Sequence, residues 1–322
     1  MKNRDTRLDG VKLVLIALVA FGHLVNYSSP SPRVGLVVAS SIYTFHMPLF
    51  ILISGHLSKT ITWEKFKKGA WPTAETFLLF SLAFVALSGG SLKHLWGPTQ
   101  SNWYLLSLLS WRLMYLVLQR YVSSKVGQIL CACLGAFAVF NCFPTNTGLL
   151  SIQRTFQFFP FFVIGATMSG LPAWRYGKWA SGLVVVAVVA LTVAYVDDRW
   201  MQLHYHLYYV RFYMERFDLS WMATNLLWLG SLAVGFLLSL AVWRLVQLPA
   251  RWAQYGRHSM AIFILQGVLT YGLKLVYTPT FLESVLLSIA IVALGIYLGE
   301  HGCTKWLSTP VTTLYRKSPR TD

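Results

Sequence analysis

A lysine and a histidine share one face of an apolar segment near the start of the chain. Lys12 and His23 are eleven positions apart in LDGVKLVLIALVAFGHLVN, a spacing of about three helical turns and a rise of roughly 16 Å. Asp9 lies three residues before Lys12 and can reach the same face. Imidazole suits proton transfer near neutral pH, so His23 is a candidate general base. The alternative is a packing histidine bonded to a neighbouring carbonyl group.

A second histidine precedes a proline in the segment FHMPLFILISGH. Pro48 inside a helix frees a backbone carbonyl group and bends the helix axis, and Gly55 permits the close approach of another backbone. His46 would then line a cavity wall, where it could orient a base or a substrate. The alternative is a bend that serves packing alone.

Two arginines and two aromatic residues also lie in or beside apolar segments. Such ionisable groups cost several kcal/mol unless they face a cavity or a partner. Arg154, at the start of QRTFQFFPFFVIG, could donate to an anion or a carbonyl oxygen, or extend to the membrane interface. Arg112 lies further inside NWYLLSLLSWR, where such an extension is less favourable. Trp103 and Tyr104 fit either a binding platform or an interfacial aromatic belt.

Apolar helices must position these residues. The 322-residue chain is 56% hydrophobic and 12% charged, whereas an average soluble domain is about a quarter charged. We predict an all-α, polytopic integral membrane protein that forms one domain over residues 1–322. The predicted transmembrane helices, about ten in number, are 11–28, 34–56, 71–89, 103–120, 126–143, 156–170, 179–196, 221–243, 258–277 and 281–300.

The basic residues support this arrangement. With a cytoplasmic N-terminus, lysines and arginines concentrate in alternate loops, as the positive-inside rule requires, and both termini are then cytoplasmic. The net charge of +16 is explained in this way, without nucleic acid as a partner. Residues 62–69 form a basic stretch expected at the inner surface, and residues 197–220 form an aromatic-rich outer loop.

These motifs together resemble the acyltransferase-3 family of membrane acyltransferases, and within it the branch related to fucose 4-O-acetylases. DGVK and GH in the first segment and FHMPLF and SG in the second carry the resemblance most strongly. NWYLLSLLSWR, RTFQFFPFF and RHSMAIFILQG extend it over nearly the whole chain. The family implies transfer of an acyl group, usually acetyl from acetyl-CoA, to a hydroxyl of a sugar or another envelope component.

The resemblance also implies roles for individual residues. Many family members have a basic residue, ten intervening positions and then a catalytic histidine, a pattern that Lys12 and His23 match. The chain departs from the family at His56, where an aromatic residue usually follows SG. It departs again at Gln266, where a histidine often stands, and Gln266 is therefore not among the residues that we expect to act.

The predicted acyl donor is acetyl-CoA, as a cosubstrate, and no metal is expected. Lys12 is the leading candidate to hold the phosphates of acetyl-CoA, with Asp9 beside it and Arg112 as a further binding residue. His23 would remove the proton of the acceptor hydroxyl, which then attacks the thioester. Arg154 or Arg112 would stabilise the oxyanion that forms.

The predicted acceptor is a carbohydrate of the cell envelope or of an exported glycan, docking at the outer side. The aromatic residues that could bind it are Trp103, Tyr104, Trp200, Tyr205, Tyr208 and Tyr209. Membrane lipids are the other expected partner, and a bacterial cytoplasmic membrane is the expected location. The alternative is a transporter or an envelope-assembly membrane protein without acyl transfer, since transporters also place charges within the membrane.

Overall fold

The computed structural model describes residues 5–26, 33–97, 101–143, 148–169, 177–195, 214–215 and 217–301, and no strand occurs among them. Inside a membrane each backbone N–H and C=O group must find a partner in the protein, which a helix provides locally. The described helices are α1 (Thr6–Val25), α2 (Arg33–Ser58), α3 (Trp63–Leu87), α4 (Lys93–Trp96), α5 (Trp103–Tyr121), α6 (Lys125–Cys142), η1 (Leu149–Ser151), α7 (Ile152–Thr167), α8 (Lys178–Tyr195), α11 (Trp221–Leu245), α12 (Ala250–Ala253), η2 (Gln254–His258), α13 (Ser259–Val276) and α14 (Phe281–Glu300).

The predicted class, an all-α polytopic membrane protein, is confirmed. In the described part of the chain, eight helical segments are long and apolar enough to cross a membrane. Two further predicted spans correspond to α5 and to α8, which is a shorter apolar helix. The polar character of α5 has a physical reason, because its residue Arg112 lines an internal cavity. The number of ten spans and the cytoplasmic placement of both termini stay predictions.

The basic stretch at residues 62–69 lies at the start of a long helix. The helix α3 begins at Trp63, eight residues before the predicted span, and continues as one helix through Pro72 to Leu87. The location of this stretch at the inner surface stays a prediction. Thr62 caps this helix, its hydroxyl oxygen accepting a hydrogen bond from the backbone N–H of Lys65 at 3.3 Å. The span expected at 71–89 is therefore preceded by about two more helical turns.

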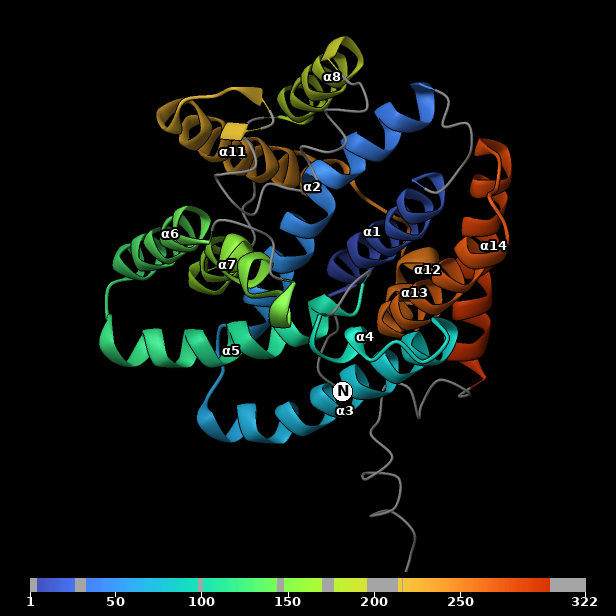
Figure 1. Cartoon of the computed structure of the whole chain (residues 1–322), viewed down its shortest axis with the longest axis horizontal. Helices are drawn as coiled ribbons and strands as arrows, with labels where there is room; N and C mark the ends of the chain where they lie inside the picture. The colour runs from blue at the N-terminus through green and yellow to red at the C-terminus, as the bar shows by residue number, and fades with distance from the viewer. Residues whose placement is uncertain are drawn as a thin grey trace, which may run out of the picture.

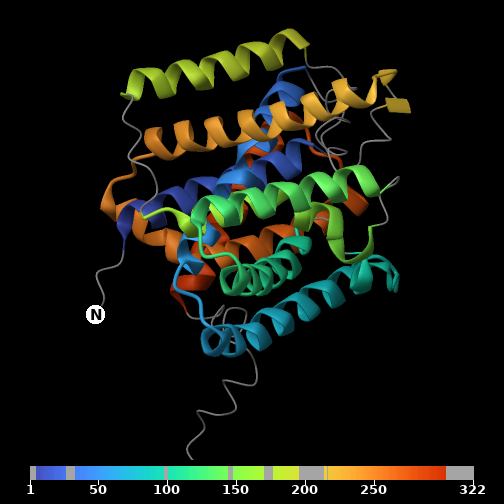
Figure 2. The ribbon, with the colours of Figure 1, turned by 90° about the vertical axis from the view of Figure 1, so that its left-hand side faces the viewer.

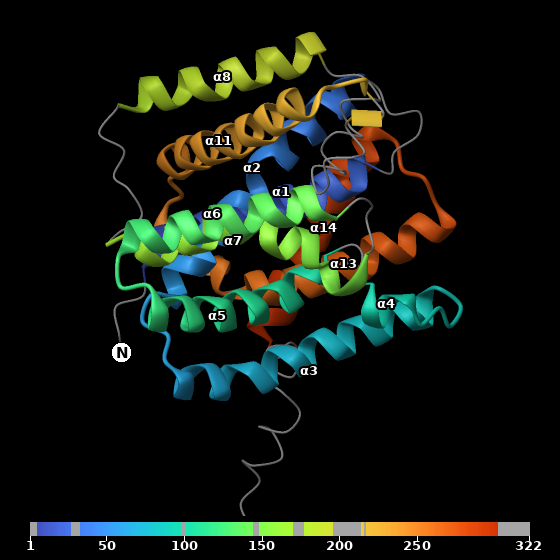
Figure 3. The ribbon, with the colours of Figure 1, turned by 60° about the vertical axis from the view of Figure 1, so that its left-hand side comes forward.

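The long helices form a bundle with α1, α2 and α7 at its centre (Figure 1). These three have the largest buried share among the candidate spans, and α2 contacts α1, α7, α8 and α11. Helices α8 and α3 lie on opposite outer sides of the bundle, with α8 packed on α11 (Figures 2 and 3). The central helices are thus the ones that can shield a polar site from lipid.

Two glycines allow α2 and α7 to cross in close contact. A Cβ atom added to Gly55 would clash with the carbonyl oxygen of Phe162, and one added to Gly165 would clash with the carbonyl oxygen of Leu52. The close approach predicted at Gly55 is confirmed. Because Gly55 lies near the end of α2 and packs near the end of α7, these two ends share one side of the bundle.

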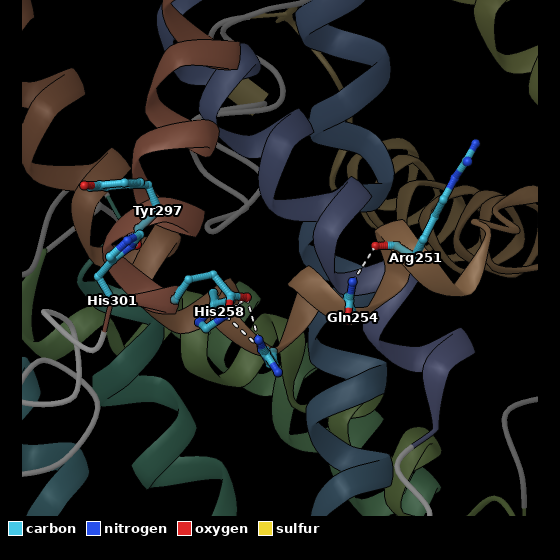
Figure 4. A network of polar contacts seen from close by, with 7 residues as sticks. Arg251, Gln254, His258, Tyr297 and His301 are labelled. Atoms are coloured by element: carbon cyan, nitrogen blue, oxygen red, sulfur yellow. Dashed lines mark hydrogen bonds and ion pairs between the residues drawn. The ribbon is translucent and has the colours of Figure 1, made fainter.

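A polar network joins η2 to the end of α14 (Figure 4). The Arg257 guanidinium lies 2.5 Å from the Glu300 carboxylate, and Nε2 of His258 lies 3.0 Å from the same oxygen. Gly256, which precedes Arg257 in η2, packs directly on the backbone of Asp9. The helix junction at η2 is therefore in direct backbone contact with the part of α1 that carries Asp9.

Candidate active site

A cavity of about 930 Å³ lies inside the bundle and is lined by residues of α1, α2, α5, α7, α8, α11 and α13. Seven of the eight residues singled out in the sequence line it, namely Lys12, His23, His46, Trp103, Tyr104, Arg112 and Arg154. Asp9 is not in the lining but contacts Lys12. Residues from four separate segments of the sequence are thus brought to one space.

On α1, Lys12 is held at the cavity by a buried carboxylate. Nζ of Lys12 lies 2.7 Å from Oδ1 of Asp9, and Asp9 is buried. The shared helix face predicted for Lys12 and His23 is confirmed, because both side chains line the same cavity. A charged group within the membrane is expected to face a cavity and a partner, and Lys12 does both.

The ring of His23 is bonded to a residue that the sequence analysis set aside. Nδ1 of His23 lies 3.2 Å from Oε1 of Gln266 on α13, and Gln266 is fully buried. The Gln266 amide nitrogen lies 3.3 Å from Oγ of Ser101 and 3.2 Å from the carbonyl oxygen of Phe263. A signal was present in the sequence, since Gln266 is one of the two positions where the chain departs from the pattern of the family that it resembles.

His46 has its ring fixed by its own helix. Nδ1 of His46 lies 2.8 Å from the carbonyl oxygen of Ile42, one turn earlier on α2. The Tyr43 ring contacts both histidine rings. Its centroid lies 6.3 Å from that of His23 and 5.1 Å from that of His46. Tyr43 and His46 both line the cavity that His23 lines.

Hydrogen bonds between α5 and α7 position Arg154. The Trp111 indole N–H donates to the carbonyl oxygen of Thr155 at 2.6 Å, and the Ser107 and Thr155 hydroxyl oxygens are 2.7 Å apart. Arg154, the neighbour of Thr155, then places its guanidinium carbon 5.5 Å from the centre of the Trp103 ring. This distance allows a cation–π contact.

The aromatic belt, one of two alternatives for Trp103, is wrong. Trp103 is 7% exposed and stacks on Phe158, with 5.7 Å between ring centroids. The hydroxyl oxygen of Tyr104 lies 2.6 Å from Oγ of Ser54 on α2. Both rings line the cavity. The other predicted aromatic residues, Trp200, Tyr205, Tyr208 and Tyr209, lie outside the described residues.

The cavity has two chemically different ends. Lys12 lies near the start of α1, on the side where α2 and α7 end. The start of α1 packs near the end of α2, with Val11 and Ile53 in one cluster, and the end of α1 packs near the start of α2, with Val25 and Ala39 in another. Arg154 and Trp103 lie at the starts of α7 and α5, on the other side. His23, in the last turn of α1, lies away from the Lys12 end.

Comparison with known proteins decides the family. The model of the acyltransferase domain of this family matches residues 5–300. The chain belongs to the acyltransferase-3 family. Acyl transfer by a membrane protein is the chemistry that this membership supports, and it favours an enzyme over a transporter or an assembly protein.

The acyltransferase is similar to proteins named "Nodulation protein NolL". It is 27% identical to the one from Mesorhizobium japonicum over 292 residues, which cover 82% of this chain and 76% of that protein. It is 39% identical to the one from Sinorhizobium fredii over 89 residues, covering 26% of this chain and 24% of that protein. No solved structure matches the chain.

Possible metal ligands do not gather in the part of the acyltransferase that the structure describes. That part contains no group of three or more histidine, cysteine, aspartate or glutamate side chains able to hold a metal ion.

Proposed function

We propose that this acyltransferase is an O-acetyltransferase of the bacterial cytoplasmic membrane, close to the fucose 4-O-acetylase branch. It would move an acetyl group from cytoplasmic acetyl-CoA to a sugar hydroxyl of a cell-envelope or exported glycan. The observation that carries the proposal is that Lys12 and His23 line one cavity from a single helix face. Lys12, as a binding group for an anionic donor, and His23, as a general base, are thereby separated by a rise of roughly 16 Å along the same helix face.

The donor would bind at the Lys12 end. Coenzyme A carries phosphate groups on a long, thin arm, which suits a cavity that begins at a cation and leads inward. Lys12 would bind a phosphate group as a point charge. Oδ1 of Asp9, 2.7 Å from Nζ of Lys12, keeps the Lys12 ammonium group in place. Arg112, partly buried in the cavity wall, is a second cation for the donor.

The acceptor would bind at the opposite end, near Trp103 and Tyr104. Sugar rings stack on aromatic side chains, and both of these rings line the cavity. A carbohydrate entering there brings a hydroxyl group towards His23, whereas the donor brings its thioester from the Lys12 side. The two substrates would therefore reach His23 from opposite ends, without competing for one entrance.

The chemical step would use His23 as general base. The imidazole takes the proton of the acceptor hydroxyl while the oxygen attacks the thioester carbon. The carbonyl oxygen becomes an oxyanion, which the Arg154 guanidinium would stabilise. The carbon–sulfur bond then breaks, and the coenzyme A thiolate receives the proton from the His23 imidazolium. The products are the acetyl ester of the sugar and free coenzyme A.

The test compares purified wild-type protein with His23→Ala in lipid nanodiscs. Both receive acetyl-CoA and a panel of envelope sugars including fucosylated glycans, and coenzyme A release and sugar mass are followed. We expect transfer by wild type and loss of about 10²-fold or more in His23→Ala, the usual contribution of a general base. His301→Ala is the matched control, since His301 is exposed and does not line the cavity. Equal turnover in wild type and His23→Ala would refute the mechanism.

A further inference from the structure

The amide of Gln266 has a defined orientation, which follows from its partners. Its nitrogen lies 3.2 Å from the carbonyl oxygen of Phe263, and a carbonyl oxygen can only accept a hydrogen bond. The end of the amide at Phe263 must therefore be the donating nitrogen. The oxygen of the amide is then the atom that lies 3.2 Å from Nδ1 of His23.

This orientation determines where the proton of the His23 ring lies. An amide oxygen has no proton to donate, so the contact is a hydrogen bond only if Nδ1 of His23 carries the hydrogen. A neutral imidazole holds one ring proton, so Nε2 is then left with a free electron pair. His23 lines the cavity, so the ring that carries this unprotonated Nε2 borders the space proposed for the substrates.

We propose that Gln266 is a positioning residue that holds His23 in the Nδ1–H tautomer and thereby makes Nε2 the base for acyl transfer. The inference rests on the proposed function, because it names the residue that prepares His23 for that reaction. In the transfer step Nε2 gains the hydroxyl proton, and the Nδ1–H bond to Gln266 is kept. Gln266 would thus stabilise both the neutral ring and the imidazolium that forms.

The position of Gln266 suits a rigid role. It lies in α13, is completely buried, and forms contacts to three different groups, Ser101, Phe263 and His23. Ser101 itself lines the cavity just before α5. The amide therefore ties the catalytic ring of α1 to α13 and to the start of α5, which limits rotation of the imidazole.

Two substitutions of similar size separate this role from simple packing. Gln266→Met and Gln266→Glu both remove the amide N–H groups that contact Ser101 and Phe263. Only Gln266→Glu keeps an oxygen in reach of Nδ1. Thr270→Val is the control for the helix, since the Thr270 hydroxyl donates to the backbone carbonyl oxygen of Gln266 and not to its side chain, and Thr270 is buried but does not line the cavity.

The first measurement is the tautomer itself, read by nitrogen NMR of the full chain labelled with ¹⁵N-histidine in nanodiscs. The His23 signals are identified as those lost in His23→Asn. At mildly alkaline pH we expect a protonated Nδ1 and a pyridine-type Nε2 in wild type and in Gln266→Glu, and a mixture of tautomers in Gln266→Met. A protonated Nε2 in wild type, or an unchanged spectrum in Gln266→Met, would overturn the inference.

The second measurement is turnover with acetyl-CoA and the accepted sugar. Gln266→Met should lower kcat by about 10-fold to 100-fold, within the ~10²–10⁴-fold that a general base contributes, with KM for acetyl-CoA unchanged. Gln266→Glu should recover most of that loss, and Thr270→Val should match wild type. If wild type transfers no acetyl group, the proposed function fails, while the spectra still decide whether Gln266 holds the His23 tautomer.

Discussion

The Lys12 ammonium nitrogen lies 2.7 Å from a carboxylate oxygen of Asp9, one turn earlier on α1. The two side chains are 18% and 5% exposed, so the pair is largely shielded from water. Asp9 is held in turn by the backbone of η2, which packs on it at Gly256. A cation that lines the cavity is therefore fixed in place by a buried carboxylate and a neighbouring helix junction.

The first prediction concerns Lys12→Ala. If Lys12 binds a phosphate of acetyl-CoA, its loss removes a charge-assisted hydrogen bond worth about 1.5–3 kcal/mol. KM for acetyl-CoA should then rise roughly 10-fold to 100-fold, with kcat changed only a few-fold. Steady-state kinetics with varied acetyl-CoA check this.

Lys12→Arg keeps the charge and should lie between wild type and Lys12→Ala. Lys178→Ala is the control, because Lys178 pairs with Gln247 away from the cavity and should leave KM unchanged. A fall in kcat without a change in KM would assign Lys12 to the chemical step and contradict its role in donor binding.

The second prediction concerns Arg154→Gln. An arginine that stabilises the oxyanion acts mainly in the transition state, so kcat should fall about 10²- to 10³-fold with little change in KM for either substrate. Single-turnover kinetics that separate binding from chemistry check it. Arg33→Gln serves as control, since Arg33 donates to the Val193 carbonyl at the exposed start of α2. A higher KM for the sugar with unchanged kcat would make Arg154 an acceptor-binding residue instead.

The third prediction concerns pH and His94 of α4, which lies outside the candidate spans. Burial lowers the pKa of the His94 imidazole below its ordinary value. The folded protein then binds this proton less readily than the unfolded chain. The contribution of neutral His94 to the free energy of unfolding is therefore fully present above the ordinary imidazole pKa. It is lost as the pH falls below that value.

His94→Asn should flatten the pH dependence of thermal unfolding on the acidic side of neutrality. Unfolding midpoints in detergent, measured for both proteins from mildly alkaline to mildly acidic pH, provide the check. His301→Ala, at an exposed position, should retain the wild-type dependence. Parallel curves for wild type and His94→Asn would show that His94 does not contribute to the pH response.

The sequence was sufficient to predict most of the long helices and seven residues that line the cavity, for a physical reason. Charges in apolar segments are costly, so the few that occur, such as Lys12, Arg112 and Arg154, mark the inner space of the bundle. The shared face of Lys12 and His23 could also be predicted, because a separation of eleven residues brings two side chains back to the same side of a helix. Contacts within a single helix, such as Asp9 with Lys12, follow from that spacing alone.

Contacts between helices were not readable in the same way. Gln266 is 243 positions from His23, and nothing in the spacing of either segment relates the two. The burial of Trp103 was likewise open, since an aromatic residue at the edge of a span suits the interface as well as the interior. The span predicted to begin at residue 71 begins eight residues earlier, because Thr62 caps a helix that starts at Trp63 and continues through Pro72.

The last prediction concerns the crossing of α2 and α7. Gly55→Ala places a Cβ atom against the Phe162 carbonyl, and a backbone contact cannot yield as a flexible side chain does. Overpacking of this kind typically costs about 1–3 kcal/mol, so the unfolding temperature in detergent should fall. Activity should fall with it, because α2 carries His46 and α7 carries Arg154. Gly182→Ala in α8 is the matched control, as nothing lies within 4 Å of its added Cβ. If both variants unfold at the wild-type temperature, α2 and α7 do not cross as closely as the Gly55 contact requires.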